Sequence, residues 1–281
     1  MGDLRRNILS TLSKNSSGGD IITDNYNYMT IYALEDGLQA KLSGNTVSYS
    51  IDEGTTWTEL ASDTYTPTVN SGQTIMFKGN LTPNSSNGIG RFSINKRCNL
   101  IGNCNSLLFG DDAANNNSLY GKNYAFYKLF SGCTAIVKVS STFLPATSLA
   151  ADCYSYMFRG CTSLVTAPSV LPAISLANTC YRGMFYGCSS LVAAPELPAT
   201  TLKDYCYHYM FYGCSKLNYI KMLATDISAS SCLTDWVSYV SSTGTFVKHP
   251  NMTSLPTGYS GIPYGWTVYN NSEEPNGGGV A

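Results

Sequence analysis

The chain has 281 residues and a net charge of −1, and its 12% of charged residues is about half of the roughly 25% found in typical soluble chains. No Lys or Arg cluster occurs after Lys14, and no apolar run approaches the ~20 residues of a membrane-spanning helix. Composition therefore argues against nucleic-acid binding and membrane insertion, while the length allows two domains with their own cores.

The N-terminal segment predicts a short amphipathic helix. Leu4, Ile8 and Leu12 are spaced i, i+4, i+8 within residues 3–13, which places them on one helix face. A polar, Gly-rich joint follows, and no secretory signal pattern precedes it. We expect residues 1–20 to anchor the protein to a larger assembly; the alternative is a frayed leader without a function.

Residues 21–108 are predicted to form an antiparallel β-sandwich, whose topology the pattern does not fix. Short alternating runs recur every 8–12 residues with Gly- and Asn-containing turns between them. The strand-sized runs are 28–34, 38–42, 47–51, 57–60 and 74–78.

One motif in this region, Ser-x-Asp-x-Gly-x-Thr-Trp at residues 50–57, resembles an Asp-box. We expect a hairpin in which Asp52 bonds turn amides, Gly54 takes a positive φ and Trp57 covers the turn. Asp-boxes are structural elements of sialidase propellers. A single copy without an arginine cluster does not predict a glycosidase.

The most informative feature is a sequence repeat that opens four times with Phe-x-Gly-Cys, at Phe130, Phe158, Phe185 and Phe211. The first three units are 28, 27 and 26 residues long. Each unit is too small to bury an apolar face alone, so this period predicts stacked units with one continuous core.

Each unit is interpreted as strand–turn–helix, the leucine-rich-repeat plan. Leu202, Cys206 and Met210 are spaced i, i+4, i+8, and Gly213 follows as a helix stop. The predicted fold class is therefore β-rich α+β, with the β-sandwich-like domain followed by a leucine-rich-repeat solenoid at 109–236. Residues 237–281 are expected to form a β cap and tail.

Eight of the ten cysteines follow the repeat and are predicted to be reduced core residues. They form two columns, which are Cys133, Cys161, Cys188 and Cys214 in one and Cys153, Cys180, Cys206 and Cys232 in the other. Disulfides within a unit, between cysteines eight residues apart, remain the alternative. A zinc site is not supported because Cys-x-x-Cys is absent and the two histidines lie apart, so we expect no metal and no cofactor.

The motif Phe-x-Gly-Cys-Ser-x-Leu…Leu-Pro-Ala-Thr-Thr-Leu…Cys-Tyr resembles the BspA-type (Treponema-type) leucine-rich repeats of Bacteroidetes surface proteins and their phages. Over about residues 28–270 the chain is similar to a module of Bacteroides phage virion proteins. The resemblance implies a head fibre, decoration or tail appendage protein assembled in the host bacterial cytoplasm, with other virion proteins and a host glycan or protein as partners and a homotrimer as one possible state. The alternative is a bacterial cell-surface adhesin.

Tyrosine, with 21 copies, supplies the candidate contact residues, because its ring is rigid and amphipathic. The candidates are Tyr154, Tyr156, Tyr181, Tyr207, His208 and Tyr212. The competing interpretation is that this column only packs between turns. Carboxylates in the repeats are few and form no recurring acid/base pair, so we expect no catalytic residues and no enzyme.

Overall fold

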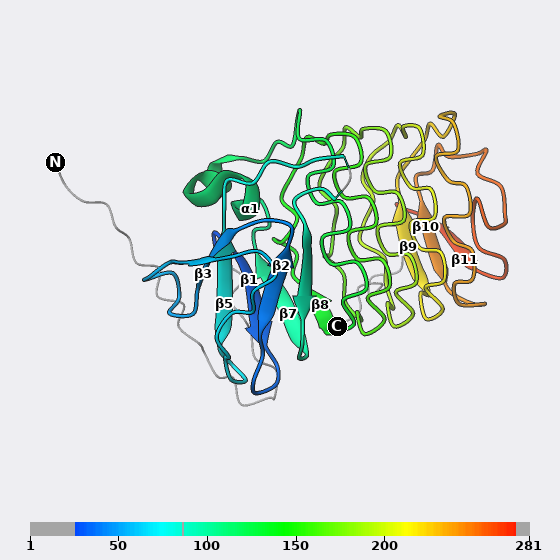
Figure 1. The fold of residues 1–281 in the computed structure, drawn as a ribbon. Coiled ribbons are helices and arrows are strands. Elements are labelled where there is room, and N and C mark those ends of the chain that lie inside the picture. The colour runs from blue at the N-terminus through cyan, green and yellow to red at the C-terminus, as the bar shows by residue number, and fades with distance from the viewer. Residues whose placement is uncertain (1–25, 86, 274–281) are drawn as a thin grey trace.

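The computed structural model describes residues 26–85 and 87–273, in which a sheet-rich N-terminal part continues into a stack of turn-rich coils (Figure 1). The strands are β1 (Met29–Ala33), β2 (Ala40–Ser43), β3 (Val47–Ser50), β4 (Thr58–Leu60), β5 (Thr74–Lys78), β6 (Arg91–Ile94), β7 (Cys98–Gly102), β8 (Ile136–Val139), β9 (Tyr219–Met222), β10 (Thr245–Lys248) and β11 (Thr267–Asn270). The helical segments of the described ranges are α1 (Ser106–Phe109) and the 3₁₀ turn η1 (Gly110–Asn115).

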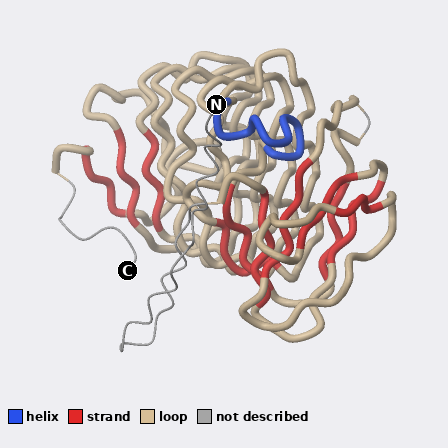
Figure 2. The backbone as a smooth tube through the Cα atoms, turned by 90° about the vertical axis from the view of Figure 1, so that its left-hand side faces the viewer, coloured by secondary structure: helices blue, strands red, loops and turns tan. Residues whose placement is uncertain are grey.

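The first sheet joins the two parts of the molecule. Its order is β4-β3-β5-β1-β7-β8, antiparallel throughout except for the parallel pair β7–β8. β2 and β6 form a separate two-stranded sheet, and β9, β10 and β11 form a parallel sheet at the far end (Figure 2). β1 to β5 lie where the alternating runs predicted strands, and β8 extends the sheet into the first repeat. The predicted domain boundaries stay a prediction.

The Asp-box forms the turn between β3 and β4. The Asp52 carboxylate accepts hydrogen bonds from the Thr56 amide (2.9 Å) and hydroxyl (2.6 Å), which hold its pKa at about 2. Gly54 has a φ of +83°, and a Cβ there would lie 3.6 Å from the Trp57 ring. The three residues therefore build the turn as a structural unit.

Each repeat forms one coil of the stack, and its backbone amides alternate between two kinds of partner. The Leu129 amide donates to the Phe126 carbonyl three residues back (3.2 Å), whereas the next amide, of Phe130, donates to Met157 in the following coil (2.9 Å). Every fourth residue has a positive φ, as in the series Asp152 (+54°), Tyr156 (+56°) and Gly160 (+71°). The coils are thus runs of turns with a period of four residues, and each run is bonded to the next.

The predicted fold class is wrong. The only helices in the described residues, α1 and η1, precede the repeats, and the segments read as helices are turns. Around Cys206, the amide donates to the Lys203 carbonyl three residues back and no bond of α-helical length follows. In the described residues the fold is neither α+β nor a strand–turn–helix solenoid. The pairs among β1–β7 are antiparallel, as expected, but β8 of the first repeat joins their sheet, so the N-terminal part is not a self-contained sandwich.

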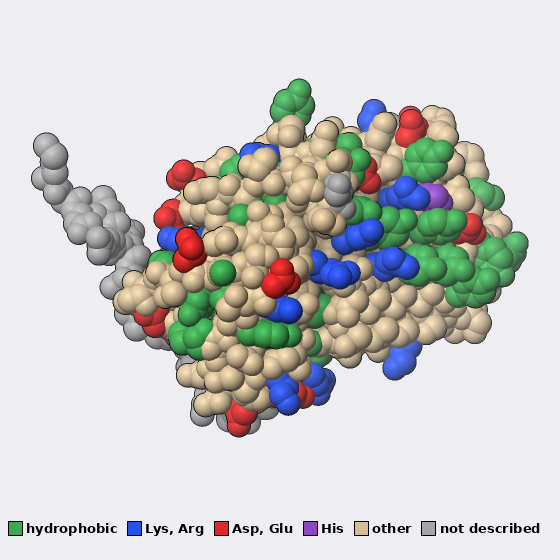
Figure 3. Space-filling model, viewed as in Figure 1, with side chains coloured by type: hydrophobic (Ala, Val, Ile, Leu, Met, Phe, Trp, Pro, Cys, Tyr) green, Lys and Arg blue, Asp and Glu red, His purple; other side chains and the backbone are tan. Residues whose placement is uncertain are grey.

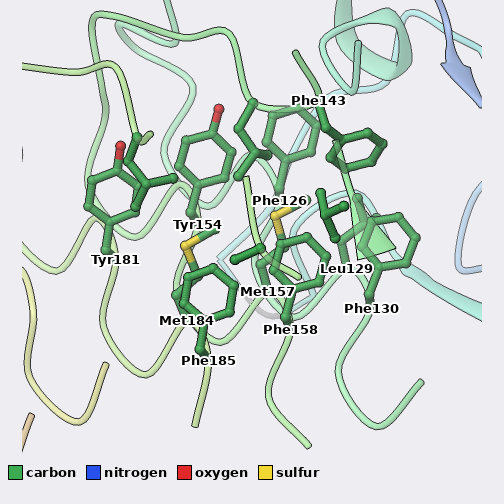
Figure 4. Close-up of a cluster of buried hydrophobic side chains, with 14 of the residues drawn as sticks. Phe126, Leu129, Phe130, Phe143, Tyr154, Met157, Phe158, Tyr181, Met184 and Phe185 are labelled. Atoms are coloured by element: carbon green, nitrogen blue, oxygen red, sulfur yellow. The ribbon is translucent and has the colours of Figure 1, made fainter. Parts of the chain in front are cut away.

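Two ladders of aromatic rings form the centre of the stack (Figure 4). In one, Phe158 lies between Phe130 and Phe185, with ring centroids 5.6 and 5.7 Å away and planes within 12°. In the other, Tyr154 lies 5.7 Å from Tyr181 with an interplanar angle of 4°. Side chains at equivalent positions therefore stack one coil above the next, as the repeat predicted.

The cysteines lie beside these ladders. All ten are free and buried, and burial raises the pKa of their thiols. The thiols of Cys161, Cys188 and Cys214 each donate to the phenylalanine carbonyl of the preceding coil at 3.1–3.2 Å. They pack as small polarizable core groups with a weak hydrogen bond.

The positive φ at every fourth position can be tested by substitution at Thr179. Thr179 is β-branched yet has a φ of +57°, where a branched side chain is strained. Thr179→Asn should stabilise the protein by about 0.5–1 kcal/mol, because Asn tolerates this conformation. Urea unfolding measures the change, with Thr162→Asn, at an exposed position without a positive φ, as the neutral control. A loss of stability in Thr179→Asn would contradict the assigned turn.

Candidate binding surface

The outward residues of the coils form one continuous aromatic band. Burial follows the four-residue period, so that Tyr154 and Phe158, four residues apart, are both buried, whereas Tyr156 between them is half-buried and Arg159 is exposed. We call the outward tyrosines the tyrosine strip, which consists of Tyr156, Tyr186, Tyr209, Tyr212, Tyr239 and Tyr259. Figure 3 shows apolar and basic side chains interleaved across the stack of coils, on the right of the view.

The rings of the strip support one another. Tyr186 and Tyr212 stack with centroids 4.7 Å apart and planes at 8°, and Tyr209 packs edge-on against both. Tyr212 continues to Tyr239 at 5.1 Å, and Tyr239 continues to Tyr259 at 6.2 Å. Tyr239 and Tyr259 are 64% and 56% exposed. The strip therefore combines a packed base with free aromatic surface, as binding sites often do.

A glycine shapes the strip near Tyr156. Gly183 occupies the position in its coil that Tyr156 occupies in the preceding one, and a Cβ at Gly183 would overlap the Tyr156 ring. The ring therefore lies flat against the backbone of the next coil. Because Gly183 has no side chain, there is room for the Tyr156 ring in this orientation.

Three cations lie among the rings. The Arg159 guanidinium is 5.9 Å from the Tyr156 ring and 5.4 Å from the Tyr186 ring. Arg182 lies 5.6 Å from the Tyr156 ring. The Lys128 ammonium group is 4.7 Å from the ring of Tyr127, which packs edge-on against Tyr156 at 6.4 Å and so adjoins the strip. At these distances the rings attract the cations electrostatically, which holds the long side chains against the surface.

Half of the predicted contact residues lie in the core. Tyr154, Tyr181 and Tyr207 are each 1% exposed and form the second ladder, so as contact residues they are corrected to packing residues. The competing interpretation, packing between turns, holds for them. These three tyrosines point inward because the four-residue period places the residue after Cys153, Cys180 and Cys206 on the core side of the coil.

The other three predicted contact residues lie at or beside the strip. Tyr156 and Tyr212 belong to it, whereas His208 is 8% exposed and stacks 3.9 Å from the Tyr209 ring. Burial and the nearby Arg182 lower the pKa of His208.

Sequence reasoning missed Tyr186, Tyr209 and Arg159. The signal that could have found them is the glycine at every fourth position, for example Gly183 and Gly187, which marks the positive-φ positions and hence the period.

A second candidate site is a hollow of about 250 Å³ beside the β7–β8 pair. Asn99, Lys138 and Thr166 are among its lining residues, and the Asn99 Oδ1 atom is buried without a hydrogen-bond partner. This hollow contains one charged side chain, while the strip extends over several coils. The strip is therefore the stronger candidate site.

The remaining predictions concern the anchor and metals. Leu4, Ile8 and Leu12 lie outside the described residues. Among residues 26–85 and 87–273, no three or more His, Cys, Asp or Glu side chains are grouped so that they could hold a metal ion. Within the same ranges no helix has the length and apolar character needed to cross a bilayer.

Comparisons of the chain with protein-family models, with curated proteins and with solved structures found no match. The resemblance to BspA-type repeat proteins and phage virion proteins rests on the motif alone and stays a prediction.

Proposed function

We propose that this protein is a non-enzymatic binding protein that adheres through the tyrosine strip to glycans or proteins of a bacterial surface. The observation that carries the proposal is the strip itself, in which exposed rings from successive coils form one band on a rigid scaffold. Rigid aromatic side chains supply contact area at a low entropic cost, and contiguous exposed apolar surface marks interaction sites.

The setting we propose is a bacteriophage particle, in which the protein serves as a head fibre, decoration or tail appendage. Support for this setting comes from the sequence motif. A bacterial cell-surface adhesin is the second candidate, supported by the same motif and able to use the same strip. Mass spectrometry of purified phage particles separates the two, because a virion protein is present in them and a cell-surface adhesin is not.

The strip is tested by removing two of its stacked rings. Tyr186→Ser with Tyr212→Ser should weaken adhesion of the labelled protein to host bacterial cells by at least about tenfold, since aromatic anchors dominate binding energies. Tyr120→Ser is the matched control, because Tyr120 is 85% exposed and does not belong to the strip. Unchanged adhesion of the double variant, or an equal loss in the control, would refute the strip as the binding surface.

A further inference from the structure

The three cations of the strip come from three successive coils and lack acidic partners. The ion pairs between described side chains are Lys78–Asp111 and Lys221–Glu196, so no described carboxylate pairs with Lys128, Arg159 or Arg182. The Nε atom of Arg182 is also buried without a hydrogen-bond acceptor. Among the described residues, the contacts of these three charged groups are with aromatic rings and not with carboxylates.

The carboxylates near the strip are engaged by the protein itself. Asp152 accepts a hydrogen bond from the Ser155 hydroxyl at 2.8 Å, and Asp235 accepts one from the Ser238 hydroxyl at 3.0 Å. The acids thus have hydrogen-bond partners of their own, whereas no described carboxylate forms an ion pair with the three cations. A ligand that completes the interactions of the strip must bring negative charge.

We propose that the strip binds an acidic polysaccharide, whose carboxylate or sulfate groups pair with Lys128, Arg159 and Arg182 while its sugars contact the exposed edges of Tyr156 and Tyr186. This inference rests on the proposed adhesive function and names the ligand class. Arg159 lies within 6 Å of both tyrosine rings, so an anion held by its guanidinium would place the attached sugar beside them.

The placement of the cations favours a linear polymer. Lys128, Arg159 and Arg182 come from three successive coils, and the stacked core rings show that successive coils follow one another at 5.6–5.7 Å. One extended chain that crosses the coils can therefore present an acidic group to each cation in turn. A nucleic acid carries a phosphate on every residue and needs a denser basic surface than three cations on a chain of net charge −1.

The test compares acidic and neutral polysaccharides on the intact protein. Chondroitin sulfate and polygalacturonate should bind the immobilised protein, neutral dextran should bind at least about tenfold more weakly, and the acidic signal should fall as salt rises from about 50 to about 200 mM. Equal binding of dextran would overturn the acidic-ligand inference and leave the adhesive function standing. Adhesion to cells without binding of any acidic polysaccharide would likewise overturn the acidic-ligand inference and leave the adhesive function standing. Failure of both cell binding and polysaccharide binding would refute both proposals.

Charge variants locate the site. Arg159→Gln with Arg182→Gln should lower affinity for the acidic polymers by at least about tenfold, and Arg159→Lys, which keeps the charge but not the planar fork, should lose less. Lys138→Gln, at an exposed residue of β8, is the matched control and should bind as the unmodified protein does. An unchanged affinity in the double variant, an equal loss in the control, or tighter binding of single-stranded DNA than of the acidic polymers would contradict the inference. Thermal melting of each variant verifies that it is folded.

Discussion

Phe158→Ala is expected to lower the free energy of unfolding by about 3–5 kcal/mol. Phe158 is fully buried between Phe130 and Phe185, so truncation leaves a cavity in the middle of the ladder and removes two stacked pairs. Backbone bonds such as that from the Phe158 amide to Met184 hold the coils at their spacing, which limits collapse around the cavity. The loss is a large part of the roughly 5–15 kcal/mol that stabilises a typical native protein.

Urea unfolding followed by tyrosine and tryptophan fluorescence measures this change. Val165→Ala is the control, because Val165 belongs to the same coil but is 42% exposed, and it should alter stability by less than about 0.5 kcal/mol. Phe158→Leu should fall between the two, since it keeps most of the buried volume. A loss below about 1 kcal/mol in Phe158→Ala would show that the ladder is not the core of the stack.

The sequence allowed the repeat register to be predicted, because stacking places equivalent residues in contact. Aligning the chain on Phe-x-Gly-Cys groups Phe130, Phe158 and Phe185, and these rings do stack. The turn at Asp52 followed in the same way from local chemistry, since its partners lie within four residues. Predictions that depended on alignment or on local bonds therefore anticipated the structure.

The conformation within a coil could not be predicted in the same way. Leu202, Cys206 and Met210 recur every four residues, and an α-helix of 3.6 residues per turn would keep them on one face with a drift of about 40° per step. Runs of turns with a positive φ at Tyr205 and Tyr209 keep the same residues buried without drift. Apolar spacing alone does not separate these two conformations. Because a tyrosine rarely has a positive φ, propensity favours the α-helix, which is the wrong conformation here.

The same error misplaced the candidate site. Tyr154 and Tyr156 are two residues apart, and only knowledge of the four-residue period shows that the first faces the core and the second the strip. The cations depend on contacts between coils, such as that of Arg159 with Tyr186, which lies in the next unit. Such contacts between coils follow only once the conformation of each coil is known.

Trp236→Ala is expected to cost about 3–5 kcal/mol and to open the C-terminal end of the stack first. Trp236 is fully buried and ends both ladders, with its ring 6.3 Å from Tyr207 and 6.0 Å from Phe211. Its Nε1 atom donates a 2.9 Å hydrogen bond to the Gly261 carbonyl, so truncation also leaves a buried acceptor unpaired. One more coil follows the coil of Trp236 and is bonded to it from the Val237 amide to the Tyr259 carbonyl, so Trp236 holds this last coil in place. Coils are coupled mainly to their nearest neighbours, and the damage should therefore stay at this end of the stack.

Amide hydrogen exchange distinguishes local opening from global unfolding. Protection should fall in the coil that contains Trp236 and in β10, where Phe246 packs 6.2 Å from the tryptophan ring, while β1 in the first sheet keeps its protection. Tyr264→Ala is the control, since Tyr264 is 63% exposed at the same end of the molecule and should leave exchange unchanged. Equal loss of protection in β1 and β10 would show that the whole chain unfolds as one unit and would contradict a local role for Trp236. If the loss is confined to the C-terminal end, the coils are coupled mainly to their nearest neighbours, as backbone bonds from each coil to the next imply.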